Sequence, residues 1–253
     1  MKVIVALTSH SIRVAHITRT TIWSILQNTY KDLQIVLTLY KDDVKLIPED
    51  LQIMIDNGIV ELIIADKDLG PHLKYFYVMQ KYRNLPIITI DDDICYPKTM
   101  IENMMKEYEL NPTCVISRRS FIMQQHNSDI TSYKIWLNHF AAYSDPSLKL
   151  FPTGVAGILY PPNILKITDE MIPELLTVKY DDDVYLKVLE IRNHILIKNI
   201  CKDSSISNNS ELYDKVNTEH NIQSIALINK NCQDENGTDS NIRKFRTEFN
   251  SLF

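Results

Sequence analysis

The first 95 residues alternate between short apolar runs and segments of helical periodicity, and this alternation constrains the fold more than any other feature. Val3–Thr8 is a continuous apolar run of the kind that forms a strand buried on both faces of a parallel sheet. Residues 33–39, Val60–Ala65 and 86–90 form similar runs, and residues 18–28 between them carry apolar side chains at helical spacing. The alternation predicts an α/β fold, in which a mostly parallel, Rossmann-like sheet is flanked by helices.

The second half of the chain is less regular. Residues 97–110 and 180–194 have helical periodicity, and residues 113–118 and 153–160 are predicted strands. No internal repeat or low-complexity segment interrupts the sequence. We therefore expect one domain over residues 1–253, made of a regular half (1–97), a mixed half (98–200) and a C-terminal extension (201–253).

Composition excludes several classes of function. The net charge of −5 argues against a nucleic-acid partner, which usually needs a basic face. The 5 glycines are too scattered for a phosphate-binding GxGxxG or Walker loop. The 4 cysteines form no CxxC pair, which disfavours structural zinc and fits a reducing compartment. With no signal peptide and no membrane-spanning apolar run, the sequence predicts a cytoplasmic protein.

The fourth apolar run leads directly into three aspartates, Asp91, Asp92 and Asp93. Ligands of open parallel sheets bind at the carboxyl ends of the strands, so these carboxylates are expected to face a site. Adjacent carboxylates repel one another without a cation, and their hard oxygens suit Mg²⁺ or Mn²⁺. Alternation along an extended chain would put Asp91 and Asp93 on one side and Asp92 on the other. The alternative is an acidic turn that caps the helix near Pro97.

A second acidic triplet, Asp181, Asp182 and Asp183, opens the most regular helix of the second half. Carboxylates stabilise a helix N-terminus, so capping alone explains one or two of the three. The functional interpretation is a general base, or a further metal contact, at the start of the helix. The sequence by itself leaves both interpretations open.

In their order along residues 1–195, these features resemble a GT-A glycosyltransferase of the family-two type, which builds glycans and polysaccharides. The resemblance implies a GT-A fold, with the nucleotide sugar bound by residues 1–97 and the acceptor and catalytic base in residues 98–200. The features that carry it are Thr8 and Ser9 at the end of the first strand, Arg13, Asp66, the Asp68-Leu69-Gly70-Pro71 turn with Lys74, the triplet at 91–93 as the DxD motif, the Thr153-Gly154-Val155-Ala156-Gly157 stretch that runs on to Pro161-Pro162, and Asp182-Asp183 in the place of the catalytic acid pair.

The resemblance also implies a chemistry: inverting transfer of a sugar from a nucleotide-diphosphate donor, with a UDP-sugar favoured, to a hydroxyl of a glycan or lipid-linked acceptor. Mn²⁺ or Mg²⁺ held by Asp93, with Asp91 on the ribose or the metal, would offset the charge of the leaving diphosphate. Relatives often add a histidine ligand, for which His194 and His220 are the candidates.

Two assignments follow for the base and the donor. Asp183, with Asp182 as the alternative, would take the proton of the acceptor hydroxyl. The side chains implied to bind the nucleotide sugar are those of Thr8, Ser9, Arg13, Asp66, Lys74, Asp91 and Asp92.

The acceptor side is less determined by the sequence. The resemblance places Gly154, Gly157 and Trp136 there, with the indole ring stacked on a sugar face. A tryptophan packed in the core is the alternative. The neighbouring Arg118 and Arg119 are candidates for binding a phosphate or an anionic acceptor, or form a solvated pair at the end of a strand.

The C-terminal segment carries apolar residues at near-helical spacing beside basic side chains: Ile242, Phe245, Phe249, Leu252 and Phe253. A basic amphipathic helix can lie on an anionic membrane, which would suit a lipid-linked acceptor. The alternative is that the helix docks back on the domain.

Three competing functions are weighed against the transferase. A haloacid-dehalogenase-like phosphatase would use Asp91 as nucleophile and Asp93 as acid, but its motif has Thr or Val where this chain has Cys95. A nucleotidyltransferase usually carries a glycine-rich loop after the first strand, and Thr8-Ser9-His10-Ser11 contains no glycine. A non-catalytic relative would bind the nucleotide sugar without turnover.

Overall fold

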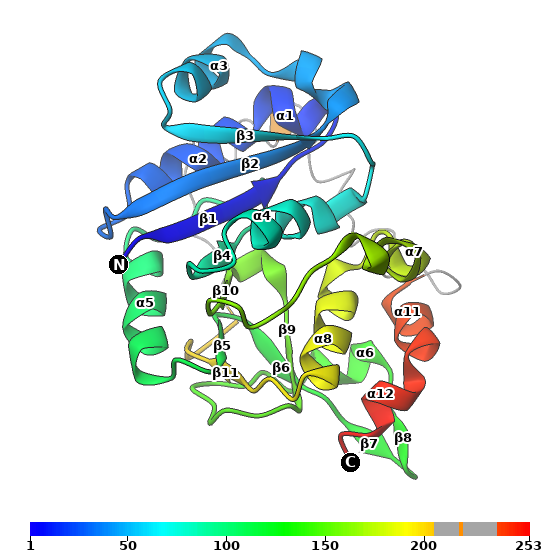
Figure 1. The fold of residues 1–253 in the computed structure, drawn as a ribbon. Coiled ribbons are helices and arrows are strands. Elements are labelled where there is room, and N and C mark those ends of the chain that lie inside the picture. Colours follow the sequence, from blue (N-terminus) through cyan, green and yellow to red (C-terminus); the bar gives the residue numbers. More distant parts are fainter. Residues whose placement is uncertain (205–217, 220–236) are drawn as a thin grey trace.

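The computed structural model describes residues 1–204, 218–219 and 237–253 (Figure 1). Its centre is a seven-stranded sheet with the strand order β11-β5-β10-β4-β1-β2-β3. In chain order these strands are β1 (Val3–Thr8), β2 (Leu33–Tyr40), β3 (Val60–Ala65), β4 (Ile87–Thr89), β5 (Val115–Ser117), β10 (Ile158–Tyr160) and β11 (Ile197–Asn199).

The sheet is mostly parallel, as predicted. β1 runs parallel to β2 and β4, β2 to β3, and β5 to β11. β10 is antiparallel to both of its neighbours, β4 and β5. Since β4 and β5 are both opposed to β10, they point the same way, and their carboxyl ends lie at the same edge of the sheet.

Helices cover both faces of the sheet (Figure 1). Two further pairs of short strands, β6 with β9 and β7 with β8, lie outside it. Their bounds are Ser120–Ile122 (β6), Gln125–His126 (β7), Asp129–Ile130 (β8) and Leu150–Pro152 (β9). The α-helices among the described residues are α1 (Ile12–His16), α2 (Thr18–Leu26), α3 (Glu49–Asp56), α4 (Phe76–Lys81), α5 (Met100–Leu110), α6 (Tyr133–Trp136), α7 (Ile172–Leu175), α8 (Asp182–Arg192), α11 (Thr238–Lys244) and α12 (Arg246–Asn250).

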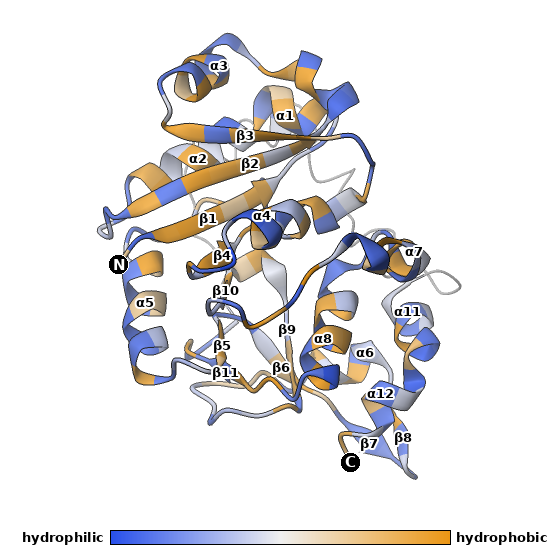
Figure 2. Cartoon of the chain, in the orientation of Figure 1, coloured by the Kyte–Doolittle hydropathy of each residue, from blue (hydrophilic) through white to orange (hydrophobic). Residues whose placement is uncertain are grey.

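The alternation of side chains along β1 divides the core into two layers. Val3, Val5 and Leu7 pack with α2, α3 and α5 on one face of the sheet. Ile4 and Ala6 pack with α4, α7 and α8 on the other. All five side chains are fully buried, and Figure 2 shows β1 and β2 as largely hydrophobic ribbons between the two layers. Burial on both faces explains why the sequence of β1 is a continuous apolar run rather than an alternating one.

The predicted strand over residues 153–160 is wrong in its first half. The chain forms a 3₁₀ turn at Gly154–Ala156, and only Ile158–Tyr160 enters the sheet as β10. Gly157, between them, has a φ of +97°, a conformation that L side chains rarely adopt and that breaks an extended run. The turn places Gly154 beside the two acidic triplets.

The C-terminal helices dock on the domain, as one of the two interpretations of their apolar face predicted. Ile242, Phe245 and Phe249 are buried, and the Phe249 ring lies 6.2 Å from that of Trp136. Asp129 in β8 pairs with the guanidinium of Arg246. These contacts join the end of the chain to its middle.

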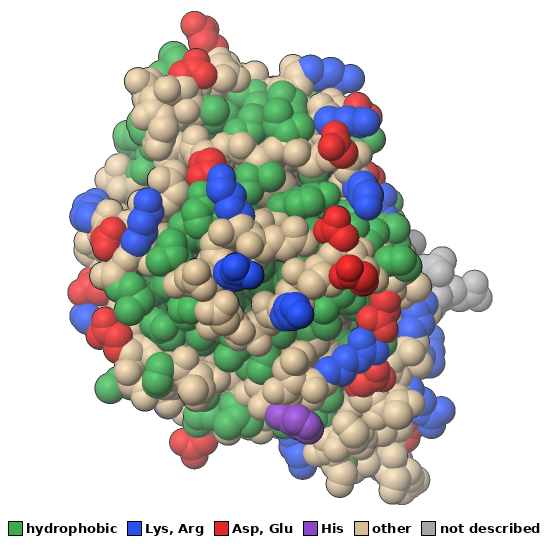
Figure 3. Space-filling view, in the orientation of Figure 1, with side chains coloured by type: hydrophobic (Ala, Val, Ile, Leu, Met, Phe, Trp, Pro, Cys, Tyr) green, Lys and Arg blue, Asp and Glu red, His purple; other side chains and the backbone are tan. Residues whose placement is uncertain are grey.

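The surface is mixed in character. On the face drawn in Figure 3, acidic and basic side chains lie interspersed among apolar ones. In the part of the chain that the structure describes, no helix is long and apolar enough to cross a bilayer.

Candidate active site

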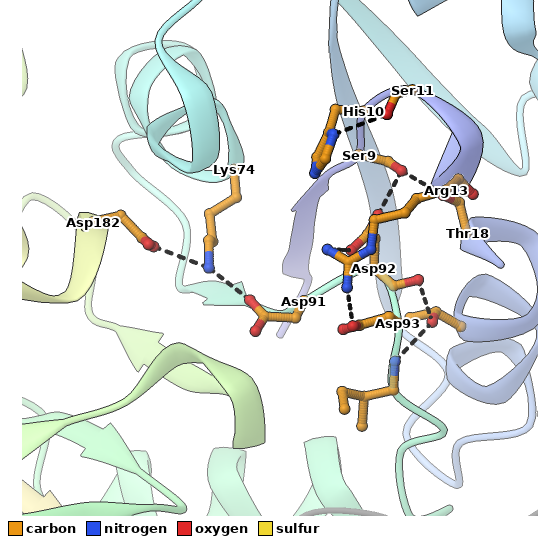
Figure 4. A network of polar contacts seen from close by, with 12 residues as sticks. Ser9, His10, Ser11, Arg13, Thr18, Lys74, Asp91, Asp92, Asp93 and Asp182 are labelled. Carbon is orange, nitrogen blue, oxygen red and sulfur yellow. Dashed lines mark hydrogen bonds and ion pairs between the residues drawn. The ribbon is translucent and has the colours of Figure 1, made fainter. Parts of the chain in front are cut away.

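The aspartates that follow β4 point to two sides rather than one (Figure 4). Asp91 faces Lys74, whereas Asp92 and Asp93 face Arg13. The alternation expected for an extended chain does not hold, because the backbone turns at Asp92 and Asp93. The triplet therefore forms two ion-paired groups.

The first group is centred on Arg13, which α1 presents from the segment after β1. Its guanidinium lies 3.1 Å from Asp92 Oδ1 and also pairs with Asp93 Oδ2. The Ser9 hydroxyl donates to the other oxygen of Asp92, and Thr18 Oγ1 donates to Ser9 Oγ over 2.7 Å. With side chains at most 10% exposed, this is a buried network that fixes the turn after β4 against the turn after β1.

The second group is centred on Lys74, at the end of the 3₁₀ turn Gly70–Lys74. Its Nζ lies 2.6 Å from Asp91 Oδ1 and 2.9 Å from Asp182 Oδ2, with only 6% of the side chain exposed. Burial alone lowers the pKa of this ammonium, but Asp182 and Asp91 outweigh burial and hold the pKa well above its usual value. Lys74 thus stays charged and joins the two acidic triplets.

Gly154 lies where the triplets and Lys74 converge. A Cβ at this position would lie 3.1 Å from Lys74 Nζ and 3.2 Å from Asp183 Oδ1. The backbone N–H of Gly154 donates to the same Asp183 oxygen over 2.9 Å. A Cβ here would be in tight contact with both groups, and Lys74 and Asp183 would have to shift by a few tenths of an ångström to accommodate it.

Asp182 and Asp183, neighbours at the start of α8, have pKa values that are shifted in opposite directions. Burial raises the pKa of Asp182, but Lys74 outweighs burial and brings this pKa below its usual value. Burial and the adjacent Asp182 charge raise the pKa of Asp183 well above that of an ordinary aspartate. Two carboxyl groups with pKa values pushed apart are typical of an acid–base site, with the raised one as the proton acceptor.

Two supporting residues, Tyr96 and Asn241, were missed by sequence reasoning. Tyr96 accepts a hydrogen bond from the Asp91 N–H and donates to the Val155 carbonyl, both over 2.9 Å, so it fixes Asp91 against the Gly154 turn. Asn241 of α11 donates to Asp181 Oδ2 over 3.2 Å, and burial raises the pKa of Asp181 to about 6. No motif marks these residues, since their partners lie far away in the sequence or in a turn.

The other predicted donor-side residues lie near the same edge of the sheet. Thr8 ends β1, and its hydroxyl is already engaged by the Thr38 carbonyl at 2.7 Å. Asp66 is exposed directly after β3. Neither contacts the carboxylates, so any role of these two in binding a nucleotide stays a prediction.

Trp136 is a correction to the sequence interpretation. It is fully buried, donates to Thr131 Oγ1 and packs against Phe151 and Phe249. Its ring is part of the core and is not available to stack on an acceptor sugar.

The structure does not support either histidine candidate for an additional metal ligand. His194 follows the C-terminal end of α8, about 16 Å along the helix axis from Asp183 at its start. His220 lies outside the described residues.

The members of the first triplet differ in how well they fit a divalent cation. Asp91 Oδ1 is bound to Lys74, while its Oδ2 has no hydrogen-bond partner among the described residues. The Asp93 carboxylate is held by Arg13, so as placed it does not fit the predicted role of main ligand. No group of three His, Cys, Asp or Glu side chains in the described ranges is arranged to hold a metal. Mg²⁺ usually takes one or two carboxylates and completes its shell with phosphate oxygens and water, so Asp91 fits a cation brought in with a diphosphate.

The comparisons with known proteins identify a fold and no sequence family. No family model matches the chain, and neither does any curated protein sequence. Among solved structures, TarS of S. aureus, a GT-A glycosyltransferase, superposes with a TM-score of 0.51 at 12% sequence identity over 91% of this chain. The fold is GT-A. This chain spans 41% of the length of TarS.

Two other solved structures resemble this GT-A chain with lower TM-scores. The mannosyltransferase PcManGT of Pyrobaculum calidifontis, in complex with GDP-Man and Mn²⁺, has a TM-score of 0.44 at 9% identity, over 99% of this chain and 69% of its own. An apo UDP-glucose pyrophosphorylase has a TM-score of 0.46 at 8% identity, over 88% and 99%.

Proposed function

We propose that this chain is an inverting glycosyltransferase that moves a sugar from a nucleotide-diphosphate donor, with UDP-sugars the first candidates, to a hydroxyl of a glycan or lipid-linked acceptor. The observation that carries the proposal is the convergence of Asp91, Lys74 and Asp183 around Gly154. It brings a cation and a proton acceptor together at the carboxyl ends of the strands, where α/β folds bind nucleotides.

The chemistry assigned to these residues is a single displacement. The acceptor oxygen forms a bond to the anomeric carbon while the bond from that carbon to the diphosphate oxygen breaks, and its electron pair leaves with the nucleoside diphosphate. The hydroxyl proton passes to Asp183, whose raised pKa makes it a stronger base than an ordinary aspartate. Lys74 keeps its charge and would stabilise the negative charge that develops on the leaving group.

The charge of the site supports a role for Mn²⁺ or Mg²⁺ in donor binding. The carboxylates of the first triplet and of Asp182 outnumber the two cations, Arg13 and Lys74, by two. A diphosphate adds further negative charge, and a divalent cation on Asp91 would supply the missing positive charge and act as a Lewis acid when bound.

The first experiment is thermal unfolding with UDP alone, Mn²⁺ alone and both together, with GDP and CDP as controls. Ligand at ~100 times its dissociation constant adds about 2.7 kcal/mol. For a chain of this size the midpoint should then rise by roughly 5–10 °C. We expect the full rise only with UDP and metal together.

Turnover is tested by release of UDP from a panel of UDP-sugars, with and without glycan acceptors. Asp183→Asn should keep the UDP-dependent rise in unfolding midpoint and lose transfer, whereas Asp50→Asn, at an exposed ion pair with Arg19, should retain both. Binding without any turnover would indicate a non-catalytic relative. No nucleotide effect at all would reject the donor site and lead to a phosphatase assay, although Asp91 and Asp93, pointing to different cations, are poorly placed for that chemistry.

A further inference from the structure

Arg118 and Arg119 connect β5 to β6, and they lie at the edge of the sheet that carries the candidate active site. The carboxyl ends of β5 and β4 lie at this edge, separated only by β10. Two strand spacings correspond to about 10 Å. The two arginines are therefore on the opposite side of β4 from β1, β2 and β3, the strands that form the predicted nucleotide half.

The side chain of Arg119 is held in place rather than freely solvated. Its Nη1 donates to Thr153 Oγ1 over 3.2 Å, and its carbonyl accepts from the Thr153 N–H over 2.9 Å. The guanidinium lies over the Phe121 ring, 4.7 Å from the ring centre. The next residue after Thr153 is Gly154, which donates to Asp183, so Arg119 is fixed beside the candidate base.

Neither arginine has a carboxylate partner among the described residues, and this distinguishes them from the chain's other partly buried arginines. Arg13 pairs with two aspartates, and Arg19 pairs with Asp50. Among the described residues, the Nε of Arg119 is buried without a hydrogen-bond partner, as is the Nε of Arg13, but no carboxylate pairs with the other nitrogens of Arg119. The guanidinium of Arg118 donates only to the Ala156 carbonyl among the described residues, over 3.1 Å.

An unpaired, partly desolvated guanidinium is costly. Burial lowers the pKa of Arg119, and the electrostatic effects of Tyr133 and Asp183 only partly oppose this lowering. A bound anion would supply both the missing charge and an acceptor for the free N–H groups.

We propose that Arg119, with Arg118 beside it, binds an oxyanion of the acceptor, so that the natural acceptor carries a phosphate or carboxylate group close to the attacking hydroxyl. The planar guanidinium matches both groups through paired N–H donors. Lys74 and Asp91 are assigned to the donor diphosphate, which leaves the arginines for the acceptor. That the anion belongs to a sugar acceptor rests on the proposed transferase function, whereas the anion-binding site itself does not.

The test measures binding of inorganic phosphate and of acetate to the full chain by calorimetry, first with the donor site saturated by UDP and Mn²⁺. The variants are Arg119→Gln, Arg119→Lys and, as a matched control, Arg243→Gln at an exposed arginine of α11. Loss of a charge-assisted bidentate contact should weaken anion binding about tenfold or more. Arg119→Lys should lie between Arg119→Gln and the wild type, because an ammonium keeps the charge but not the paired geometry.

Comparing the two anions distinguishes a phosphorylated acceptor from a carboxylated one. Stronger binding of phosphate assigns a phosphorylated acceptor, and stronger binding of acetate assigns a carboxylated one. The inference is overturned if neither anion binds the wild type, or if Arg119→Gln binds both as well as Arg243→Gln does. Unfolding midpoints with and without UDP are recorded for every variant. If UDP has no effect on any of them, the proposed function fails separately, and the anion titration is then read without UDP.

Discussion

Replacing Lys74 by methionine should show how much the fold depends on the cation between the two triplets. Methionine keeps most of the side-chain volume, so the change removes mainly the charge. Asp91 and Asp182 would lose their partner, and Asp182 is only 11% exposed. Removing one member of a buried ion pair costs about 3–5 kcal/mol, because the remaining charge stays buried without compensation. At roughly 2–4 °C per kcal/mol for this chain length, the unfolding midpoint should fall by about 6–20 °C.

The loss should depend on pH in a defined direction. Lys74 lowers the pKa of Asp182, so this carboxylate contributes stability above the pKa of an unfolded aspartate, about 3.9, and that contribution is lost as the pH falls through its folded pKa. Without Lys74 the pKa of Asp182 rises, and protonation relieves the buried charge at mildly acidic pH. The midpoint difference between Lys74→Met and the wild type should therefore be larger at pH 8 than at pH 5.

The control is Lys81→Met, since Lys81 pairs with Glu61 over 2.8 Å but is 55% exposed. An exposed pair of this kind contributes under about 1 kcal/mol. Both variants are followed by circular dichroism during heating at the two pH values. A Lys74→Met midpoint within 2–3 °C of that of Lys81→Met, roughly one kcal/mol at this size, or a loss that is the same at both pH values, would refute the role assigned to Lys74.

Three further predictions concern single positions. Asp183→Asn should lower the rate of transfer by about 10²–10⁴-fold. It should also raise the unfolding midpoint more at pH 8 than at pH 5, because an acid with a raised folded pKa destabilises the fold as the pH rises. An equal effect on the midpoint at both pH values would contradict the raised pKa. Gly70→Ala should destabilise the protein more than Gly58→Ala in urea unfolding. Both glycines have positive φ, but a Cβ at Gly70 would lie 2.7 Å from a backbone carbonyl, whereas a Cβ at Gly58 meets nothing within 4 Å. Equal losses of stability in the two variants would be inconsistent with this packing. Phe249→Ala should cost about 3–5 kcal/mol in the same assay and Phe253→Ala, 42% exposed, much less, whereas similar values would argue against the docked C-terminal helices.

The regular half of the fold was predictable because its signals are local. β1 and β3 match the expected runs residue for residue, and β2 and β4 differ from theirs only at the ends. A strand buried on both faces must be apolar throughout, so its limits are visible in the sequence. The same argument placed the first triplet at a strand end, where it is found.

The second half was less predictable because distant contacts determine it. The turn at Gly154 depends on the approach of Lys74 and Asp183, 80 and 29 positions away in the sequence. Trp136 is buried because the C-terminal helices supply Phe249 as a neighbour, and periodicity carries no information about such a partner. The different directions of Asp91 and Asp93 likewise depend on which cations the neighbouring strands bring to them.

The two cations of the site have different roles, which follow from what surrounds each of them. Arg13 binds Asp92 and Asp93 in a network that is almost closed to solvent, so its charge stabilises the contact between two turns. Lys74 binds Asp91, whose side chain is 29% exposed and has a free oxygen, and Asp182, which adjoins the candidate base. A ligand that enters the site therefore meets the carboxylate of Asp91 and the charge of Lys74 together. Because carboxylates still outnumber cations there, a diphosphate should bind well only with a divalent cation, and we expect metal-dependent binding of UDP from the arrangement of charge as well as from the predicted DxD motif.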